Sequence, residues 1–334
     1  MATLSANNPT LLDLAKSKDP DGKIASVVEI LNATNEILDE MSWKEGNLAT
    51  GNRTTIRSGL PTPTWRKLYG GVQPSKSTKV QVTDNVGELV AYAEIDKSLA
   101  DLEGNTAAFR LSEDAAFIEG ISEELATTVM YGNETTQPEA FTGFSPRFNS
   151  LSAANAENII NAGGVGVDNG SIWLIVWGAN TVHGIVPKGS TAGLQMTDKG
   201  VVTLQNVDGV NGRMEAYMTH YVLKAGLTVR DWRYIVRIAN IDKSLLLPDH
   251  STGADLVSEM FKAMRRIPNL NAGRPVFYMS RDMATMVAQQ LAKDGASSFL
   301  TSESAGGDMR WTEKYHGIPM RRVDALSADE AVVA

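Results

Sequence analysis

Residues 46–83 of this 334-residue chain read GNLATGNRTTIRSGLPTPTWRKLYGGVQPSKSTKVQVT. The stretch holds six basic residues, three prolines, five glycines and no carboxylate. Because it has few apolar residues, it cannot bury a core of its own, so we expect it to project and to rest on another surface. Its basic residues are Arg53, Arg57, Arg66, Lys67, Lys76 and Lys79.

The charge changes sign directly after this stretch. Residues 84–146 hold thirteen carboxylates against two basic residues, so a net charge of +6 is followed by one of −11. A basic arm beside an acidic body, repeated in identical copies, lets each copy lay its arm on its neighbour. The simpler alternative is a solvated β-hairpin with an accidental bias. In the first interpretation the six basic residues are candidates for contacts between subunits.

Residues 53–95 have the pattern of extended chain on both sides of a Pro- and Gly-rich tip, which predicts a long two-stranded ribbon. An isolated ribbon is marginally stable in water and needs a docking surface outside itself. The strongest helix is predicted at residues 112–131, with Ser112 as its N-cap and Gly132 as its end. At about 1.5 Å per residue it would be roughly 30 Å long. Its apolar stripe consists of Ile118, Ile121, Leu125 and Val129.

The rest of the chain alternates strand patterns with helix patterns, and a short amphipathic arm precedes the ribbon. The closing part has a helix–strand–helix–strand order, which predicts a layered α+β domain. The predicted strands are 172–177, 182–186, 214–223, 227–241, 275–279 and 318–323, and the later helices are 254–266 and 281–293.

The sequence carries no recognisable catalytic constellation. It has no cysteine, which excludes disulfides, thiolate nucleophiles and Cys-ligated metals. Its four histidines lack the spacing of metal ligands on one helix face, and the glycines at 163–170 have the wrong spacing for a dinucleotide loop. There is no phosphate-binding loop and no nucleophile elbow. We therefore predict no catalytic, cofactor-binding or metal-binding residue, and no enzyme.

Two clusters of side chains could be interpreted as functional sites. Carboxylates of the 112–131 helix could form an acid/base pair, but opposite an apolar stripe they are more typical of a solvated or interface face. Bases and aromatics at 230–237 could stack on nucleic acid, but a partly buried strand explains them better. The net charge of −8 predicts only non-specific contact with DNA. No apolar run has the length of a membrane helix, so we expect no membrane contact.

Six stretches, taken in order, resemble the major capsid proteins of tailed bacteriophages with the Hong Kong 97-like fold, most closely the podovirus type. Together they are spread over most of the chain. They are 53–62 (RTTIRSGLPT), 71–78 (GVQPSKST), 105–114 (NTAAFRLSED), 171–178 (SIWLIVWG), 226–234 (GLTVRDWRY) and 317–326 (GIPMRRVDAL).

The resemblance implies an α+β fold in four parts. These are an N-terminal arm at 1–45, an extension loop at 46–96, a peripheral domain at 97–245 that contains the long spine helix, and an axial domain at 246–334. One departure stands out, because the strands between 171 and 242 precede the axial-like block of 254–326. This order suggests a permuted topology.

The resemblance also implies a function without an active site. The chain would self-assemble as pentamers and hexamers into the icosahedral head that encloses double-stranded phage DNA. Its partners would be its own copies, a portal and a scaffolding protein, and a decoration or cement protein. It would reside in the virion after synthesis in the cytoplasm of the host bacterium, since no secretory signal is visible. The alternatives are a cellular encapsulin-like nanocompartment shell and, more distantly, an enzyme of unknown class.

Overall fold

The computed structural model describes residues 35–102, 106–190, 192–205, 212–249, 251–293, 300–304, 311–327 and 329–334. Most of the predicted N-terminal arm therefore lies outside the described residues. The chain folds into two compact units, each assembled from segments that are distant in sequence. Among the described residues, the first unit comprises those within Glu88–Leu125 and Gly193–Lys224, and the second comprises those within 35–87, Ala126–Ala192 and Ala225–Ala334.

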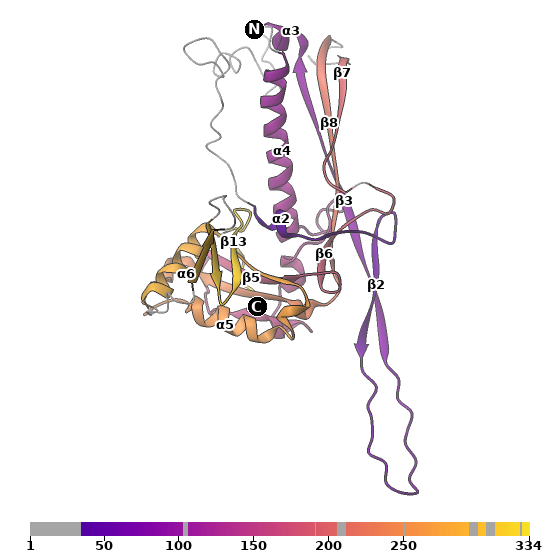
Figure 1. The fold of residues 1–334 in the computed structure, drawn as a ribbon, viewed down its shortest axis with the longest axis vertical. Coiled ribbons are helices and arrows are strands. Elements are labelled where there is room, and N and C mark those ends of the chain that lie inside the picture. The colour runs from indigo at the N-terminus through magenta and orange to yellow at the C-terminus, as the bar shows by residue number, and fades with distance from the viewer. Residues whose placement is uncertain are drawn as a thin grey trace. The chain divides into compact units, whose positions relative to one another are not determined.

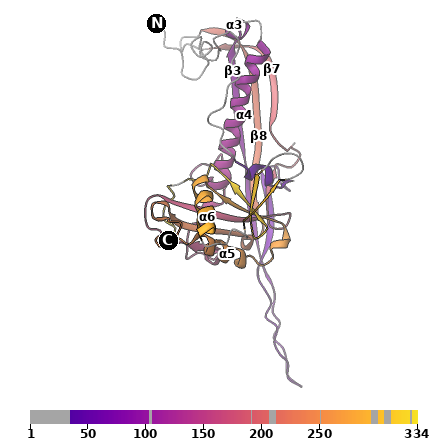
Figure 2. The same cartoon turned by 60° about the vertical axis from the view of Figure 1, so that its left-hand side comes forward.

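The first unit combines most of one long helix with a β-sheet. Helix α4 runs beside β3 and the β7–β8 hairpin (Figure 1, Figure 2). The hairpin is antiparallel, with a bulge between Asp198 and Gly200. Helix and hairpin are joined by Arg110, whose Nη2 lies 2.9 Å from Asp198 Oδ1. The bounds are α3 (Lys97–Asp101), α4 (Thr106–Tyr131), β3 (Thr78–Asp96), β7 (Gln195–Gln205) and β8 (Arg213–Val229).

Helix α4 begins at Thr106, six residues before the predicted start. The prediction of Ser112 as the N-cap is therefore wrong, since Ser112 lies inside the helix. The extra turns follow from packing, because Phe109 is buried with Ile95 and Leu99 in a small core. Nothing in the local pattern of residues 106–111 signals that contact.

The predicted stripe of α4 is mostly correct. Ile121, Leu125 and Val129 are buried, whereas Ile118 is 44% exposed. The helix ends before Gly132, as predicted. A side chain at Gly132 would come within 2.5 Å of two carbonyl oxygens, those of Phe141 and Thr128, so the chain can turn there only with glycine.

The second unit is built around a sheet whose central strand is β5. Strands β9 and β10 flank β5 in antiparallel orientation, and β13 continues the sheet parallel to β10. Strands β4, β6 and β12 extend it further, and β1 and β11 pair at its margins. The bounds are β1 (Trp43–Glu45), β4 (Ile159–Asn161), β5 (Asn169–Trp177), β6 (Val182–Val186), β9 (Ile235–Asp242), β10 (Arg274–Met279), β11 (Leu300–Ser304), β12 (Trp311–Tyr315) and β13 (Ile318–Arg322).

Strands β5 and β9 are buried along their whole length, which explains the unbroken apolar run at Ile172–Trp177. On one face Ile172, Leu174 and Val176 join a core supplied by α5 (Leu256–Arg266) and α6 (Arg281–Lys293). The two helices lie against the sheet in Figure 1. On the other face the rings of Phe144 and Phe148 lie 6.0 Å from that of Trp173.

Short elements complete the second unit. Helix α2 (Ile37–Glu40) is followed by β1, and five 3-10 turns join the longer elements at Ser145–Phe148, Ala156–Asn158, Trp232–Tyr234, Lys243–Leu245 and Leu270–Ala272. The Glu40 carboxylate of α2 is buried and accepts hydrogen bonds from Arg274, Arg321 and Tyr278. These contacts fix the described beginning of the chain to the sheet.

Strands from both sides of the predicted boundary at 245/246 share this sheet, because β10 pairs with β5. The boundary therefore does not separate two sheets. The four-part division and the permuted order stay predictions. Among the described residues no helix combines the length and apolarity needed to cross a membrane.

The C-terminal residues are tied to the second unit by a buried polar network. Arg237 Nη2 lies 2.9 Å from Glu330 Oε2, and both side chains are almost fully buried. Tyr131 OH donates to Glu330 Oε1 at 2.6 Å, and Ser171 Oγ donates to the other carboxylate oxygen. Burial and the Glu330 charge raise the pKa of Tyr131 far above its usual range, so its hydroxyl remains a donor. The network joins the end of α4, β5, β9 and the C-terminal residues.

Replacing Glu330 by alanine should lower the free energy of unfolding by about 3 to 5 kcal/mol, because the Arg237 charge stays buried without its partner. Urea denaturation measures this change. The control is Asp282→Ala, which removes an 80% exposed partner of Lys243 and should cost no more than about 1 kcal/mol. Equal urea midpoints for Glu330→Ala and Asp282→Ala would contradict the assignment of a buried ion pair between Arg237 and Glu330.

Candidate functional site

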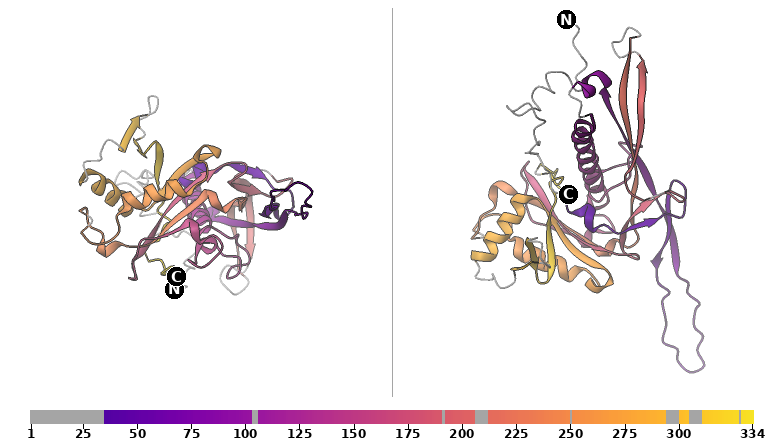
Figure 3. Two further views of the ribbon diagram at one scale, coloured as in Figure 1. Left: turned by 90° about the horizontal axis from the view of Figure 1, so that it is seen from below. Right: turned by 45° about the horizontal axis from the view of Figure 1, so that its top comes forward.

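The ribbon predicted from the sequence is present within the second unit. Strand β2 (Gly51–Gly59) pairs antiparallel with the first part of β3, from Gly51 opposite Asn85 to Gly59 opposite Thr78. Residues 60–77 continue as two extended segments without regular secondary structure (Figure 1, Figure 3). At the tip, Gly70 N donates to Lys67 O at 3.0 Å, and Tyr69 has a φ of 63°.

The register gives the ribbon two different faces. Residues directly opposite each other lie on the same face of an antiparallel pair. One face therefore carries the basic pair Arg57–Lys79 together with Arg53, and the other carries the apolar pair Ile56–Val80. Val80 is 51% exposed, so the apolar face is open to solvent.

All six candidate contact residues are exposed, and none forms an ion pair with a carboxylate among the described residues. Arg57 and Lys79 stand directly opposite each other, which is unfavourable for like charges. Arg53 Nε donates to Thr83 Oγ1, and Arg66 Nε donates to Gly70 O. The six residues form three groups, with Arg53, Arg57 and Lys79 on the paired strands, Arg66 and Lys67 at the tip, and Lys76 between them.

The tip also carries large apolar side chains. Trp65 and Tyr69 are fully exposed, and Leu68 is 90% exposed. The charge pattern of the sequence did not point to them, although Trp65 and Tyr69 flank the segment that contains Arg66 and Lys67. The signal was available, because an aromatic residue between prolines and glycines has no core within reach.

The ribbon is fixed at its root by a buried ion pair. Asp84 Oδ1 lies 2.9 Å from Arg147 Nη2, and the Asp84 side chain is 2% exposed. Burial raises the pKa of Asp84, and the nearby Arg147 charge offsets this only in part. Strand β2 can approach this point closely because residue 51 is a glycine, whose added side chain would lie 2.1 Å from Asp84 O. Sequence reasoning missed this pair, since its members are far apart in the chain.

The other residues considered from the sequence form no metal or nucleotide site in the described parts of the chain. They hold no group of three or more His, Asp or Glu side chains that could bind a metal ion. His183 is buried, and burial together with Lys44 and Arg230 lowers its pKa to about 4, so it is neutral. The glycine-rich segment at 163–168 precedes β5 and does not join a strand to a helix.

A two-faced ribbon, a doubly covered sheet and a long helix in one chain define the class of bacteriophage capsid proteins with the Hong Kong 97-like fold. Comparison with known proteins supports the same class. The chain is 36% identical to a chain of the near-atomic cryo-EM structure of bacteriophage Epsilon15, with a TM-score of 0.77 and 100% of both chains covered.

A family model described as major capsid protein GP7 matches residues 19–334, and the chain belongs to this family. The predicted fold class and the function of a bacteriophage major capsid protein are thus confirmed. No curated protein matched the sequence.

Two other solved structures have much lower sequence identity to this chain and lower TM-scores. The capsid of bacteriophage JBD30 is 10% identical, with 96% of this chain and 99% of that chain covered and a TM-score of 0.42. The SrpI encapsulin of Synechococcus elongatus is 9% identical, with 69% and 94% covered and a TM-score of 0.45. At these scores neither adds to the assignment.

The raised pKa of Asp84 predicts a pH effect. The folded protein takes up a proton at Asp84 at a higher pH than the unfolded chain does, so the cost of the buried charge disappears as the pH falls. The stability of the wild type relative to Asp84→Asn should therefore increase as pH falls from the raised pKa toward the ordinary value of 3.8. Urea denaturation at several pH values measures this difference. A constant difference between the two proteins would contradict it.

Proposed function

We propose that this chain self-assembles as hexamers and pentamers into the icosahedral head that encloses the double-stranded DNA of its phage. The observation that carries the proposal is the ribbon at 51–83, which exposes both of its faces. Its own chain leaves the basic face without carboxylates and the apolar face open at Val80, although Thr54 on that face is buried near the root. A second copy of the chain supplies carboxylates to the basic face and covers the apolar face.

The six basic residues of the ribbon are the proposed inter-subunit contacts. Each exposed ion pair contributes only about 0.2 to 1 kcal/mol. A closed shell repeats the same contacts in every copy, so many weak interactions act together. The acidic residues at 84–146, many of them on β3 and α4, are the proposed partners of these bases.

The four-part organisation follows from the same proposal. Residues 1–45 serve as the N-terminal arm, 46–96 as the extension loop, 97–245 as the peripheral domain with its spine helix, and 246–334 as the axial domain, in a permuted order. The exposed ribbon supports the second of these assignments. The long helix α4 supports the third.

The remaining partners are inferred from the family. A portal and a scaffolding protein take part in assembly, and a decoration or cement protein can bind the finished shell. With a net charge of −8 the chain contacts packaged DNA only non-specifically. We infer that it has no enzyme activity, that it is made in the cytoplasm of the host bacterium, and that it resides in the virion.

An encapsulin-like nanocompartment is the second candidate. The structural similarity to the SrpI encapsulin is too low to favour it, whereas the phage relative matches over the whole chain. Shells that contain protein in place of DNA would support the nanocompartment. The distant alternative, an enzyme of unknown class, has no candidate site among the described residues.

Reversing two of the ribbon charges should block assembly. The double variant Arg57→Glu, Arg66→Glu replaces attraction to a neighbour by repulsion and leaves the core untouched. Electron microscopy should show no closed shells, and the melting temperature of the free subunit should be unchanged. The matched control is Arg57→Lys, Arg66→Lys, which keeps both charges and should assemble. Normal shells from the Glu variant would make the ribbon charge incidental.

Amide exchange should distinguish the free subunit from the shell. Residues 60–77 form no strand pairing, so their amides should exchange rapidly in the free subunit. In shells, contact with a neighbour should slow this exchange, and the amides of β5 should be protected in both states. Equal exchange of 60–77 in both states would argue against docking of the ribbon.

A further inference from the structure

Residues 329–334 lie on the second unit as an extended segment outside any helix or named strand, and we call this segment the strap. An isolated β-bridge joins Glu330 to Asn169 of β5, and Glu330 N donates to Asn169 O at 2.9 Å. Further along, Leu151 N donates to Ala334 O at 2.9 Å. The strap is thus held through its main chain, which is how proteins commonly bind extended peptides.

The side chain of Asn240 in β9 binds the main chain of Val333 through both of its polar atoms. Asn240 Nδ2 donates to Val333 O at 2.9 Å, and Val333 N donates to Asn240 Oδ1 at 2.8 Å. Asn240 Nδ2 also donates to Asn161 Oδ1 at 3.0 Å, a contact that does not involve the strap. Asn240 has a φ of 58°, which is uncommon for a residue with a side chain. The amide is therefore oriented by the body of the second unit.

The strap buries two of its six side chains. Glu330 is 8% exposed and Val333 is 5% exposed. The Glu330 carboxylate accepts hydrogen bonds from Arg237, Tyr131 and Ser171. The surface beneath the strap thus selects a carboxylate and, three residues later, a small aliphatic side chain. The exposed residues of the strap are Asp329, Ala331, Val332 and Ala334.

The carboxylate-binding part of this surface is held in place by groups outside the strap. Arg237 Nη1 donates to Phe148 O at 2.7 Å, and Arg237 Nε donates to Ser171 Oγ at 3.0 Å. The guanidinium carbon of Arg237 also lies 5.0 Å from the centre of the Trp173 ring. Because these contacts remain when the strap leaves, the site is preorganised for a carboxylate.

A cavity of about 370 Å³ lies beside the strap. Tyr131, Ser145 and Asn149 line it from the body of the second unit, and Ala331 and Val332 line it from the strap. The middle of the strap is therefore loosely packed, and its attachment depends on the two buried side chains and the main-chain hydrogen bonds. Segments with few buried contacts can open while the rest of a protein stays folded.

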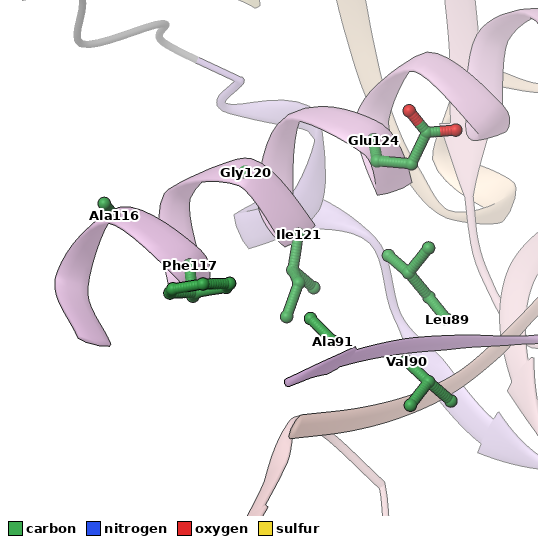
Figure 4. A pocket seen from close by; sticks show the side chains of 8 residues that line it. All are labelled: Leu89, Val90, Ala91, Ala116, Phe117, Gly120, Ile121 and Glu124. Atoms are coloured by element: carbon green, nitrogen blue, oxygen red, sulfur yellow. The ribbon is translucent and has the colours of Figure 1, made fainter. Parts of the chain in front are cut away.

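The groove of the first unit between β3 and α4 has a different character. Apolar side chains line most of it, among them Phe117 and Ile121, which project from α4 toward the strand (Figure 4). In binding sites it is the polar groups that fix the orientation of a ligand and give specificity. The groove beneath the strap has such groups in Asn240 and Arg237, so it defines a peptide sequence.

We propose that the groove beneath the strap is a binding site for an extended peptide with the pattern Glu-x-x-Val, and that residues 329–334 close this site by occupying it. The strap is then an autoinhibitory contact, because a peptide from outside the chain can bind only after the strap has opened. The inference goes beyond the proposed function and does not depend on it, since it concerns a single subunit.

A synthetic peptide with the sequence of the strap, DEAVVA, tests the site on the full-length variant Glu330→Gln. The substitution weakens the chain's own strap and leaves the groove unchanged, so the peptide should raise the melting temperature of the variant in a saturable manner. The matched control peptide DQAVVA lacks the carboxylate and should bind about tenfold more weakly or worse. No effect of DEAVVA, or an equal effect of the two peptides, would overturn the proposal.

Amide exchange of the wild type tests the opening of the strap, also in case Glu330→Gln does not fold. The amides of Glu330, Val333 and Leu151 donate in contacts between the strap and the groove. They should exchange through one common opening, at least about tenfold faster than the amides of β5. Exchange of these three amides at the rate of the β5 amides would show that the strap opens only on global unfolding, and would overturn the proposal.

Discussion

Burial of β5 on both of its faces is the constraint on which the second unit depends. A strand covered on both sides must be apolar at nearly every position, and Ile172 to Trp177 meets this requirement. Alternate residues then serve two different cores, one with the helices α5 and α6 and one with the phenylalanines around Trp173. Arg237 and Glu330 are buried beside this strand in a hydrogen-bonded network, which offsets the cost of burying their charges.

The ribbon is in the opposite situation to β5, because most of its surface is exposed. It is covered only near its root, where Thr54 and Asp84 are buried, whereas Val80, Arg57 and Lys79 further along are exposed. Its root is rigid, since Asp84 is buried against Arg147 and Gly51 lets the strands meet closely. Its far end has only the turn at Lys67–Gly70 and a few side-chain hydrogen bonds. The root is thus held by the second unit, whereas the far end makes few contacts with the described chain.

Much of this architecture could be predicted from local sequence. Extended chain on both sides of a Pro- and Gly-rich tip indicated the ribbon, the stripe of Ile121, Leu125 and Val129 indicated the helix, and the apolar run at 172–177 indicated the central strand. The start of α4 could not be predicted, because it depends on Phe109 packing against Leu99 across a break in the helical pattern. The sheet that joins β5 to β10 depends on a contact between segments about a hundred residues apart, which no local pattern encodes.

The candidate site was predicted in part. The six bases were visible as a charge pattern, and their exposure agrees with it. Trp65 and Tyr69 were overlooked because aromatic residues are normally associated with a core, although the surrounding prolines and glycines indicated that no core is within reach. The pair of Asp84 and Arg147 joins residues from two distant segments, so its burial becomes apparent only in the folded chain.

Two of the three prolines of the ribbon, Pro61 and Pro63, have a consequence for the subunit before it assembles. Thr62 O faces across the ribbon, where it accepts a hydrogen bond from Ser75 Oγ at 3.1 Å. Because backbone groups alternate in direction along an extended chain, Pro61 and Pro63 occupy the positions whose amides would point outward. Proline has no amide hydrogen, so these two positions of the outer edge offer no donors to another strand. The two prolines thus hinder strand pairing between newly made subunits at this exposed edge, and such pairing would lead to aggregation.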